Sequence, residues 1–219
     1  PLAAPCQLEL KTRVTRIERD ALDPAGWQLR TEAGEARHVY GGFDGVMLAL
    51  PAPQAADLLA TSGLSPKGLR KLASVDIAPC WTLMLAFPNA MQPDLVTLGP
   101  QWNAARSVHH RVAWLARESS KPGRDHIERW TVQASAAWSQ EHLEDAPERV
   151  QAKLIKAFSE ITGIRATPAH AEVHRWRYAK TLQPLGATHM HSAKQGIGVC
   201  GGDDAACTTG GGGGEIGAA

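Results

Sequence analysis

The sequence predicts an α/β (α+β) fold, with a mixed β-sheet and helices packed against it. Three observations predict this fold. The first forty positions alternate between apolar and polar residues, Gly45–Leu50 is apolar throughout, and Pro147–Thr162 carries the apolar stripe of an amphipathic helix. Strand-like segments outnumber helical ones and no internal repeat is visible, so we expect one mixed architecture.

The N-terminal segment is expected to form a β-meander. Leu8, Leu10, Val14 and Ile17 lie among polar residues, and two glycine-containing turns follow before residue 36. Such alternation places the apolar side chains on one face of a half-buried sheet.

The next segment, Gly45–Leu50, is predicted to be a different kind of strand. It is apolar on both faces, which is typical of a strand covered on both sides in a central or parallel position. Pro51 and Pro53 end it and favour a helix over residues 54–59, because proline is tolerated in the first helical turn. A second short helix is expected after Ser65–Pro66.

Five more strands and one long helix complete the expected elements. Residues 147–162 form the helix, and Gly163 can close it. In the third of these strands Trp130, Val132 and Ala134 share one face. The strands are predicted over residues 80–87, 111–116, 127–135, 169–178 and 196–200.

Composition limits the possible partners. The 219 residues include 43% hydrophobic residues, 23 basic and 22 acidic ones, and the formal net charge is +1. Without a long basic run, we expect no nucleic-acid or membrane-surface partner. The longest apolar run, residues 46–52, is too short to span a bilayer, and the N-terminus lacks the features of a signal peptide. Four scattered cysteines without a CxxC pair favour free thiols and a cytoplasmic location.

The ends of the chain lead to two further expectations. The sequence has no initiator methionine and enters a strand-like run at once, so we interpret it as a truncated part of a larger protein. Residues 208–219 are rich in glycine and are expected to be disordered, because ordering such a segment costs much backbone entropy. Residues 1–207 form the remaining predicted domain.

Five segments, in this order, resemble the renalase-like branch of the FAD-dependent amine-oxidase superfamily. Their order and spacing over residues 6–203 make the resemblance fairly specific. The segments are FDGVMLALPAPQA at 43–55, WLAR with SKPGRD at 114–125, WTVQAS with WS at 130–139, HRWRYA at 174–179 and GIGVCG at 196–201.

The resemblance implies a two-part enzyme in which a Rossmann-like part binds FAD and a mixed sheet shapes the substrate pocket. Such an enzyme oxidises a small amine or a reduced nicotinamide and passes hydride to the flavin. The chain would be mainly the substrate-binding part. The phosphate-binding fingerprint of the family is missing, and the formal match Gly196-x-Gly198-x-x-Gly201 lies in a predicted strand with no helix after it. The alternative is a non-catalytic α+β ligand-binding module, or a truncated fragment that no longer binds FAD.

The resemblance also implies a set of residues that contact FAD. Val14 would meet the adenine, although a lone strand valine is usually a core residue. Leu50 and Pro51 would pass near the adenosine, and an ordinary strand end explains them equally well. The tail residues depart from the family pattern, so a damaged tail is an alternative for them. These implied tail contacts are Gly201, Gly202, Asp203, Glu215 and Gly217.

His174, Trp176 and Tyr178 are the candidate substrate-pocket residues. They alternate along one strand and would share a face, from which the aromatic rings could stack on a planar ligand. A half-exposed sheet face with aromatic anchors is the alternative. Trp114 and Trp138 are expected to be buried packing residues.

No catalytic side chain and no metal site is predicted. The sequence His189-Met190-His191 with Cys200 and Cys207 fits no common zinc-ligand spacing and is interpreted as a surface loop. Flavin oxidation needs no acid–base pair in principle, so the absence of such a motif does not oppose the resemblance.

Overall fold

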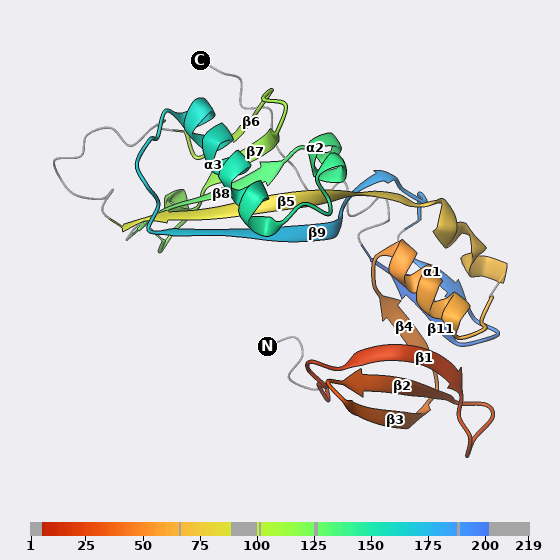
Figure 1. Ribbon diagram of the computed structural model, residues 1–219. Coiled ribbons are helices and arrows are strands. Elements are labelled where there is room, and N and C mark those ends of the chain that lie inside the picture. The colour runs from red at the N-terminus through yellow and green to blue at the C-terminus, as the bar shows by residue number, and fades with distance from the viewer. Residues whose placement is uncertain are drawn as a thin grey trace. The chain divides into compact units, whose positions relative to one another are not determined.

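The computed structural model describes residues 6–65, 67–88, 100, 102–124, 127–187 and 189–201, and these form two compact units (Figure 1). One unit comprises Pro1–Asp76 with Thr181–Ala219, and the other comprises Ile77–Lys180. The predicted domain boundary after residue 207 lies outside the described residues.

The first unit contains the predicted meander. Three antiparallel strands form a sheet in the order β1-β2-β3. Ile17 and Trp27 are fully buried, and the Trp27 indole N–H donates a hydrogen bond of 2.9 Å to the Gln195 carbonyl. Leu8 and Leu10 precede the first strand and are exposed, so the predicted strand began too early. The strands are β1 (Arg13–Arg19), β2 (Trp27–Ala33) and β3 (Ala36–Phe43).

A second small sheet in the same unit contains the apolar segment after Gly45. Its order is β10-β11-β4, and β11 runs parallel to β4, which is one of the two positions expected for this segment. The prediction that this strand is covered on both faces is wrong, because Leu48 is buried whereas Met47 is 59% exposed. β4 ends the strand order of this sheet and packs on one face only. The strands are β4 (Val46–Ala49), β10 (Met190–Ser192) and β11 (Ile197–Cys200).

The segment around His191 also differs from its prediction. Residues 190–192 form strand β10 rather than a surface loop, with Met190 opposite Val199 of β11. Three residues are too few for an alternating pattern to show in the sequence, so only the pairing with β11 identifies the strand.

Glycines allow the close approach between β4 and β11. The amide of Val46 donates to the Gly196 carbonyl at 2.9 Å, and a Cβ atom on Gly45 would lie 2.9 Å from that same oxygen. Gly196 itself has a φ of +67°, which favours glycine. Two glycines of the apparent fingerprint, Gly196 and Gly198, therefore serve close strand packing, since a Cβ atom on Gly198 would lie 2.6 Å from Met47.

Two helices follow β4. Helix α1 (Ala52–Thr61) begins after Pro51 and buries Ala55 and Leu59, so the predicted helix over residues 54–59 is confirmed and is longer by two residues at each end. The predicted second helix is the 3₁₀ helix η1 (Lys67–Ser74), which buries Leu69 and Leu72. Pro66, half of its predicted cap, lies outside the described residues.

The Ile77–Lys180 unit is built on a five-stranded sheet in the order β6-β7-β8-β5-β9. The predicted strands and the long helix are confirmed, whereas the short elements β6 and α2 were not predicted. β9 also continues past its predicted end at Tyr178. The elements are β5 (Asp76–Phe87), β6 (Ala104–Arg106), β7 (Val112–Arg117), η3 (Glu118–Ser120), β8 (Glu128–Ala134), α2 (Ala136–Glu141), α3 (Pro147–Thr162) and β9 (His170–Gln183).

Helix α3 covers one face of this sheet. Its apolar stripe packs against side chains from the central strands, and Gly163 ends the helix with a φ of +75°. The Phe158 ring lies 5.6 Å from Trp130 and 6.1 Å from Phe87. The core includes Leu83, Leu85, Leu115, Val132, Trp138, Val150, Leu154 and Phe158.

One buried ion pair lies at the edge of this core. The Glu128 side chain is only 1% exposed, and Arg117 donates to its two carboxylate oxygens at 2.8 and 2.9 Å. Ser119 adds a hydrogen bond of 2.9 Å. A carboxylate is tolerated at this depth because its oxygens are paired.

We predict that Phe158→Ala lowers the free energy of unfolding by about 3–5 kcal/mol, because it opens a cavity between α3 and the sheet. Lys156→Ala, on the exposed side of the same helix, is the control and is expected to change it by less than about 0.5 kcal/mol. Urea unfolding followed by circular dichroism measures both variants. Equal effects would show that Phe158 does not anchor α3.

We also predict that Arg117→Met destabilises the chain by about 3 kcal/mol, because Glu128 would lose the cation that compensates its burial. The matched control is Arg124→Met, which removes an exposed partner of Glu118 and is expected to cost at most about 1 kcal/mol. Thermal unfolding of the two variants tests the difference. An Arg117→Met variant as stable as the parent chain would contradict it.

Candidate functional site

A pocket of about 630 Å³ lies on the five-stranded sheet, entirely within the Ile77–Lys180 unit. All five strands and the start of α2 contribute to it. The lining residues are Pro79, Cys80, Thr82, Arg106, Ala113, Trp114, Gln133, Ala134, Ala136, Trp176, Tyr178, Ala179 and Lys180.

The strand register places this pocket on the face opposite α3. Thr82 pairs with Gln133, Gln133 with Trp114, and Trp114 with Arg106, so these four side chains form a row across four strands. Their chain neighbours alternate with them and include Leu83, Val132 and Leu115, which pack under α3. The pocket therefore uses the sheet face that the helix leaves open.

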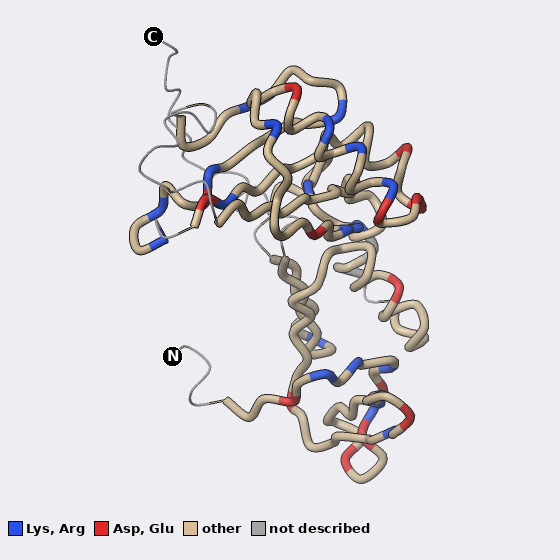
Figure 2. Tube along the Cα trace, turned by 60° about the vertical axis from the view of Figure 1, so that its left-hand side comes forward, with Lys and Arg blue, Asp and Glu red and all other residues tan. Residues whose placement is uncertain are grey.

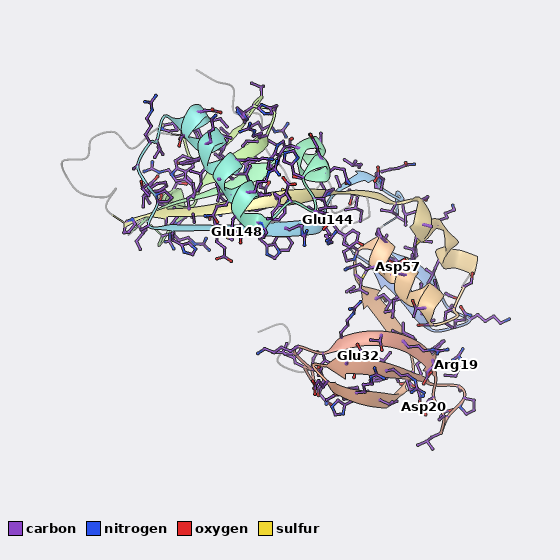
Figure 3. All side chains as sticks on the ribbon, viewed as in Figure 1. Arg19, Asp20, Glu32, Asp57, Glu144 and Glu148 are labelled. Atoms are coloured by element: carbon purple, nitrogen blue, oxygen red, sulfur yellow. The ribbon has the colours of Figure 1, made fainter. Side chains whose placement is uncertain are left out.

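Two of the three predicted substrate-pocket residues line this pocket. Trp176 and Tyr178 are lining residues, whereas His174 is not and lies with its ring 4.3 Å from that of Trp176. The alternation of β9 explains the placement, because Arg175 and Arg177 point the other way. Both donate to Glu144, which is labelled in Figure 3. Contact of the two aromatic rings with a ligand stays a prediction.

The two tryptophans expected to be buried, Trp114 and Trp138, differ in their exposure to solvent. Trp138 is buried in the core, as predicted. Trp114 is 36% exposed and lines the pocket, so that prediction is wrong. The register pairs Trp114 with Gln133 on the open face of the sheet, which the sequence of β7 alone does not reveal.

Several lining residues were missed by the sequence analysis. Lys180 offered a signal, because it continues the two-residue alternation of Trp176 and Tyr178. Arg106 and Gln133 offered none, because only the strand pairing places Arg106 beside Trp114 and Gln133 beside Thr82 on this face.

The charged side chains of the pocket are all basic. Arg106 and Lys180 are the charged lining residues, and no carboxylate lines the pocket among the described residues. With the rings of Trp114, Trp176 and Tyr178, this arrangement suits a planar ligand better than a small cation. Figure 2 shows that elsewhere acidic and basic residues are interspersed along both units.

Cys80 is a further lining residue, on β5. Burial is the main influence and raises the pKa of its thiol above the ordinary value, against the smaller opposing effect of hydrogen bonding with Thr82 and the Ala134 carbonyl. The raised pKa keeps Cys80 protonated near neutral pH. Cys80 therefore contributes a protonated, polarisable thiol to the pocket lining and does not act as a thiolate nucleophile.

The other unit contains the described residues implied in FAD binding. Leu50 and Pro51 follow β4, and Gly201 follows β11, directly after the parallel pair of Ala49 with Cys200. These residues therefore meet at the carboxyl edge of two adjacent parallel strands, where α1 also begins. This edge is where open α/β sheets bind nucleotides, so the residues present fit the adenosine side of a dinucleotide.

Among the described residues, no interaction brings the remaining implied FAD contacts to the carboxyl edge of β4 and β11. Val14 is half-buried on β1, in the separate meander sheet. Gly202, Asp203, Glu215 and Gly217 lie outside the described residues.

Within the described residues, no helix is long and apolar enough to cross a membrane. Cys6, Cys80 and Cys200 are free thiols, and Cys207 lies outside the described residues.

Comparison with known proteins identifies a family, one curated relative and two solved structures with a similar fold. A family profile described as flavin containing amine oxidoreductase matches residues 2–192. Mouse (Mus musculus) renalase is 25% identical over 207 residues, which cover 90% of this chain and 56% of renalase. The chain thus spans about half the length of the curated relative that it matches.

Two solved structures share the fold. A protein described as a protoporphyrinogen oxidase from Exiguobacterium sp. 255-15 superposes with a TM-score of 0.63 at 14% identity, over 88% of this chain and 42% of that one. Cyclohexylamine oxidase from Brevibacterium oxydans IH-35A gives 0.54 at 12% identity, over 87% and 42%. Both similarities support the mixed-sheet α+β architecture.

We predict that Cys80 is alkylated by iodoacetamide only at higher pH than free cysteine, because the thiolate is the reactive form and burial disfavours it. The chain for this measurement carries serine at Cys6, Cys200 and Cys207. The alkylation rate as a function of pH, with free cysteine in parallel, gives the two midpoints. A midpoint at or below that of free cysteine would contradict the buried position of the thiol.

Proposed function

This chain belongs to the family of flavin-containing amine oxidoreductases, and we propose that it is mainly the substrate-binding part of an FAD-dependent oxidoreductase. The proposed enzyme oxidises an amine or a reduced nicotinamide and transfers hydride to the flavin. The family match over residues 2–192 is the observation that carries this proposal. The domain that it concerns is residues 1–207.

The pocket supports a proposal in which the cofactor supplies the oxidation and this chain binds the substrate. FAD, when bound, would supply the oxidising chemistry. Trp176 and Tyr178 would orient a planar substrate on β9, and Trp114 would line the same surface from β7. The described pocket has no side chain placed as a catalytic acid–base pair. Its residues would bind, orient and exclude water.

The cofactor residues of the proposal are those implied by the family resemblance. Leu50, Pro51 and Gly201 would approach the nucleotide at the carboxyl edge of β4 and β11, and their position fits this role. Val14, Gly202, Asp203, Glu215 and Gly217 complete the set as proposals.

The proposal also covers the substrate class and the cellular location of the protein. We propose a small-molecule substrate and a cytoplasmic location, which the free thiols of Cys6, Cys80 and Cys200 support.

A non-catalytic ligand-binding module is the second candidate. It is favoured by the missing phosphate-binding fingerprint, because Gly196 and Gly198 of the apparent GxGxxG match lie against residues 44–47. Such a module would keep the open sheet face and its aromatic side chains without the flavin.

We predict that the purified chain binds FAD that is added in excess but loses most of it on gel filtration, because the β4–β11 edge fits the nucleotide whereas the phosphate-binding fingerprint is missing. Titration of FAD fluorescence with the chain measures binding, and the visible flavin spectrum after gel filtration measures the FAD that is retained. With FAD in excess, anaerobic addition of an amine or a reduced nicotinamide is expected to bleach the flavin band. A chain that binds a planar ligand at Trp176 but binds no added FAD would contradict the oxidoreductase and support the binding module.

A further inference from the structure

The open face of β9 carries a short linear array of binding groups. Trp176, Tyr178 and Lys180 all line the pocket and occupy alternate positions of the strand. Alternate residues on a strand are roughly 6.6 Å apart, so a ring that lies on Tyr178 would reach the Lys180 ammonium with a substituent. The array therefore combines aromatic surface with a cation on one side.

The cations of the pocket are not neutralised by any described side chain, unlike several other cations of this unit. Arg117 is paired with Glu128, and Arg175 and Arg177 are paired with Glu144. In contrast, Lys180 and Arg106 have no hydrogen-bond or ion-pair partner within the described parts of the chain. Two unpaired cations that line one pocket create a positive potential there.

The acidic residue on the same face of β9 is distant from this array. Glu172 lies eight residues before Lys180, roughly 26 Å away along a strand, and pairs with His170 at 3.5 Å. Arg106 is on the opposite edge strand, about 19 Å from β9 across the sheet. Lys180 is therefore the pocket cation nearest to Trp176 and Tyr178, whereas Arg106 lies beside Trp114 on the far side of the sheet.

We infer that this pocket selects a substrate with a planar ring and an anionic group, the ring lying on Trp176 and Tyr178 and the anion bound by Lys180. The same charges disfavour a protonated amine, so they restrict the substrates that the family otherwise admits. The anion is a carboxylate or a phosphate, which share this recognition chemistry. The inference rests on the proposed function in taking the pocket as the substrate site.

A series of ligands with one ring system and different charges tests this selection. The ligands are 2-naphthoate, 2-naphthyl phosphate, neutral 2-naphthamide and cationic 2-naphthylmethylamine, and ligand-observed NMR titration of the full 219-residue chain gives each Kd. We expect both anions to bind at least about tenfold more tightly than the amine, because Coulomb attraction to the unpaired cations becomes repulsion. The anion with the lower Kd shows whether the pocket prefers a carboxylate or a phosphate.

Charge-removing variants test whether Lys180 and Arg106 cause the preference for anionic ligands. Lys180→Gln is expected to weaken 2-naphthoate binding about threefold to fivefold and to leave 2-naphthamide unchanged, because an exposed ion pair contributes little more than this. Arg106→Gln is expected to have a smaller effect in the same direction. Lys156→Gln, on α3 at the other side of the sheet, removes the same charge outside the pocket and is expected to change neither Kd.

Three results would overturn the inference. These are equal affinity for the anions and the amine, an equal effect of Lys156→Gln and Lys180→Gln, and displacement of 2-naphthoate by FAD, which would assign the pocket to the cofactor. Failure of the chain to bind FAD added in excess counts against the proposed oxidoreductase separately, because the ligand series is measured without FAD. The two ideas can therefore fail independently.

Discussion

The covering of only one face of the five-stranded sheet by α3 is the constraint on which the rest of this unit depends. Strand residues alternate between faces, so packing Leu83, Val132 and Leu115 beneath the helix turns Thr82, Gln133 and Trp114 to the other side. Hydrophobic burial thus determines which side chains remain available for a ligand. The helix face supplies the stability of the unit, and the open face supplies its pocket.

The helices and the longer strands could be predicted because their signals are local. The apolar stripe and closing glycine of α3, the proline start of α1 and the alternation of the meander are all visible in short windows of sequence. Strands β6 and β10 have three residues each and exist only through pairing, so local sequence does not reveal them. The segment of β4 was interpreted as fully covered because both its faces are apolar, yet it packs on one face only.

The candidate site was predictable only in part for the same reason. Trp176 and Tyr178 lie on one strand, and their alternation placed them on a common face. Arg106, Gln133 and Trp114 come from three other strands, and their meeting with β9 depends on the sheet order. The residues proposed to contact FAD show the same limit of local sequence, since Leu50 and Gly201 come together only through the parallel pairing of β4 with β11.

The central claim is that the open face of the five-stranded sheet is the binding face of this flavin-family chain. Backbone amide NMR shifts of the chain during titration with 2-naphthoate test it most directly. Our account predicts that the largest shifts occur at Trp114 and over residues 176–180, with small shifts along α3. Shifts concentrated on α3 and its buried partners, or none on β9, would contradict the claim.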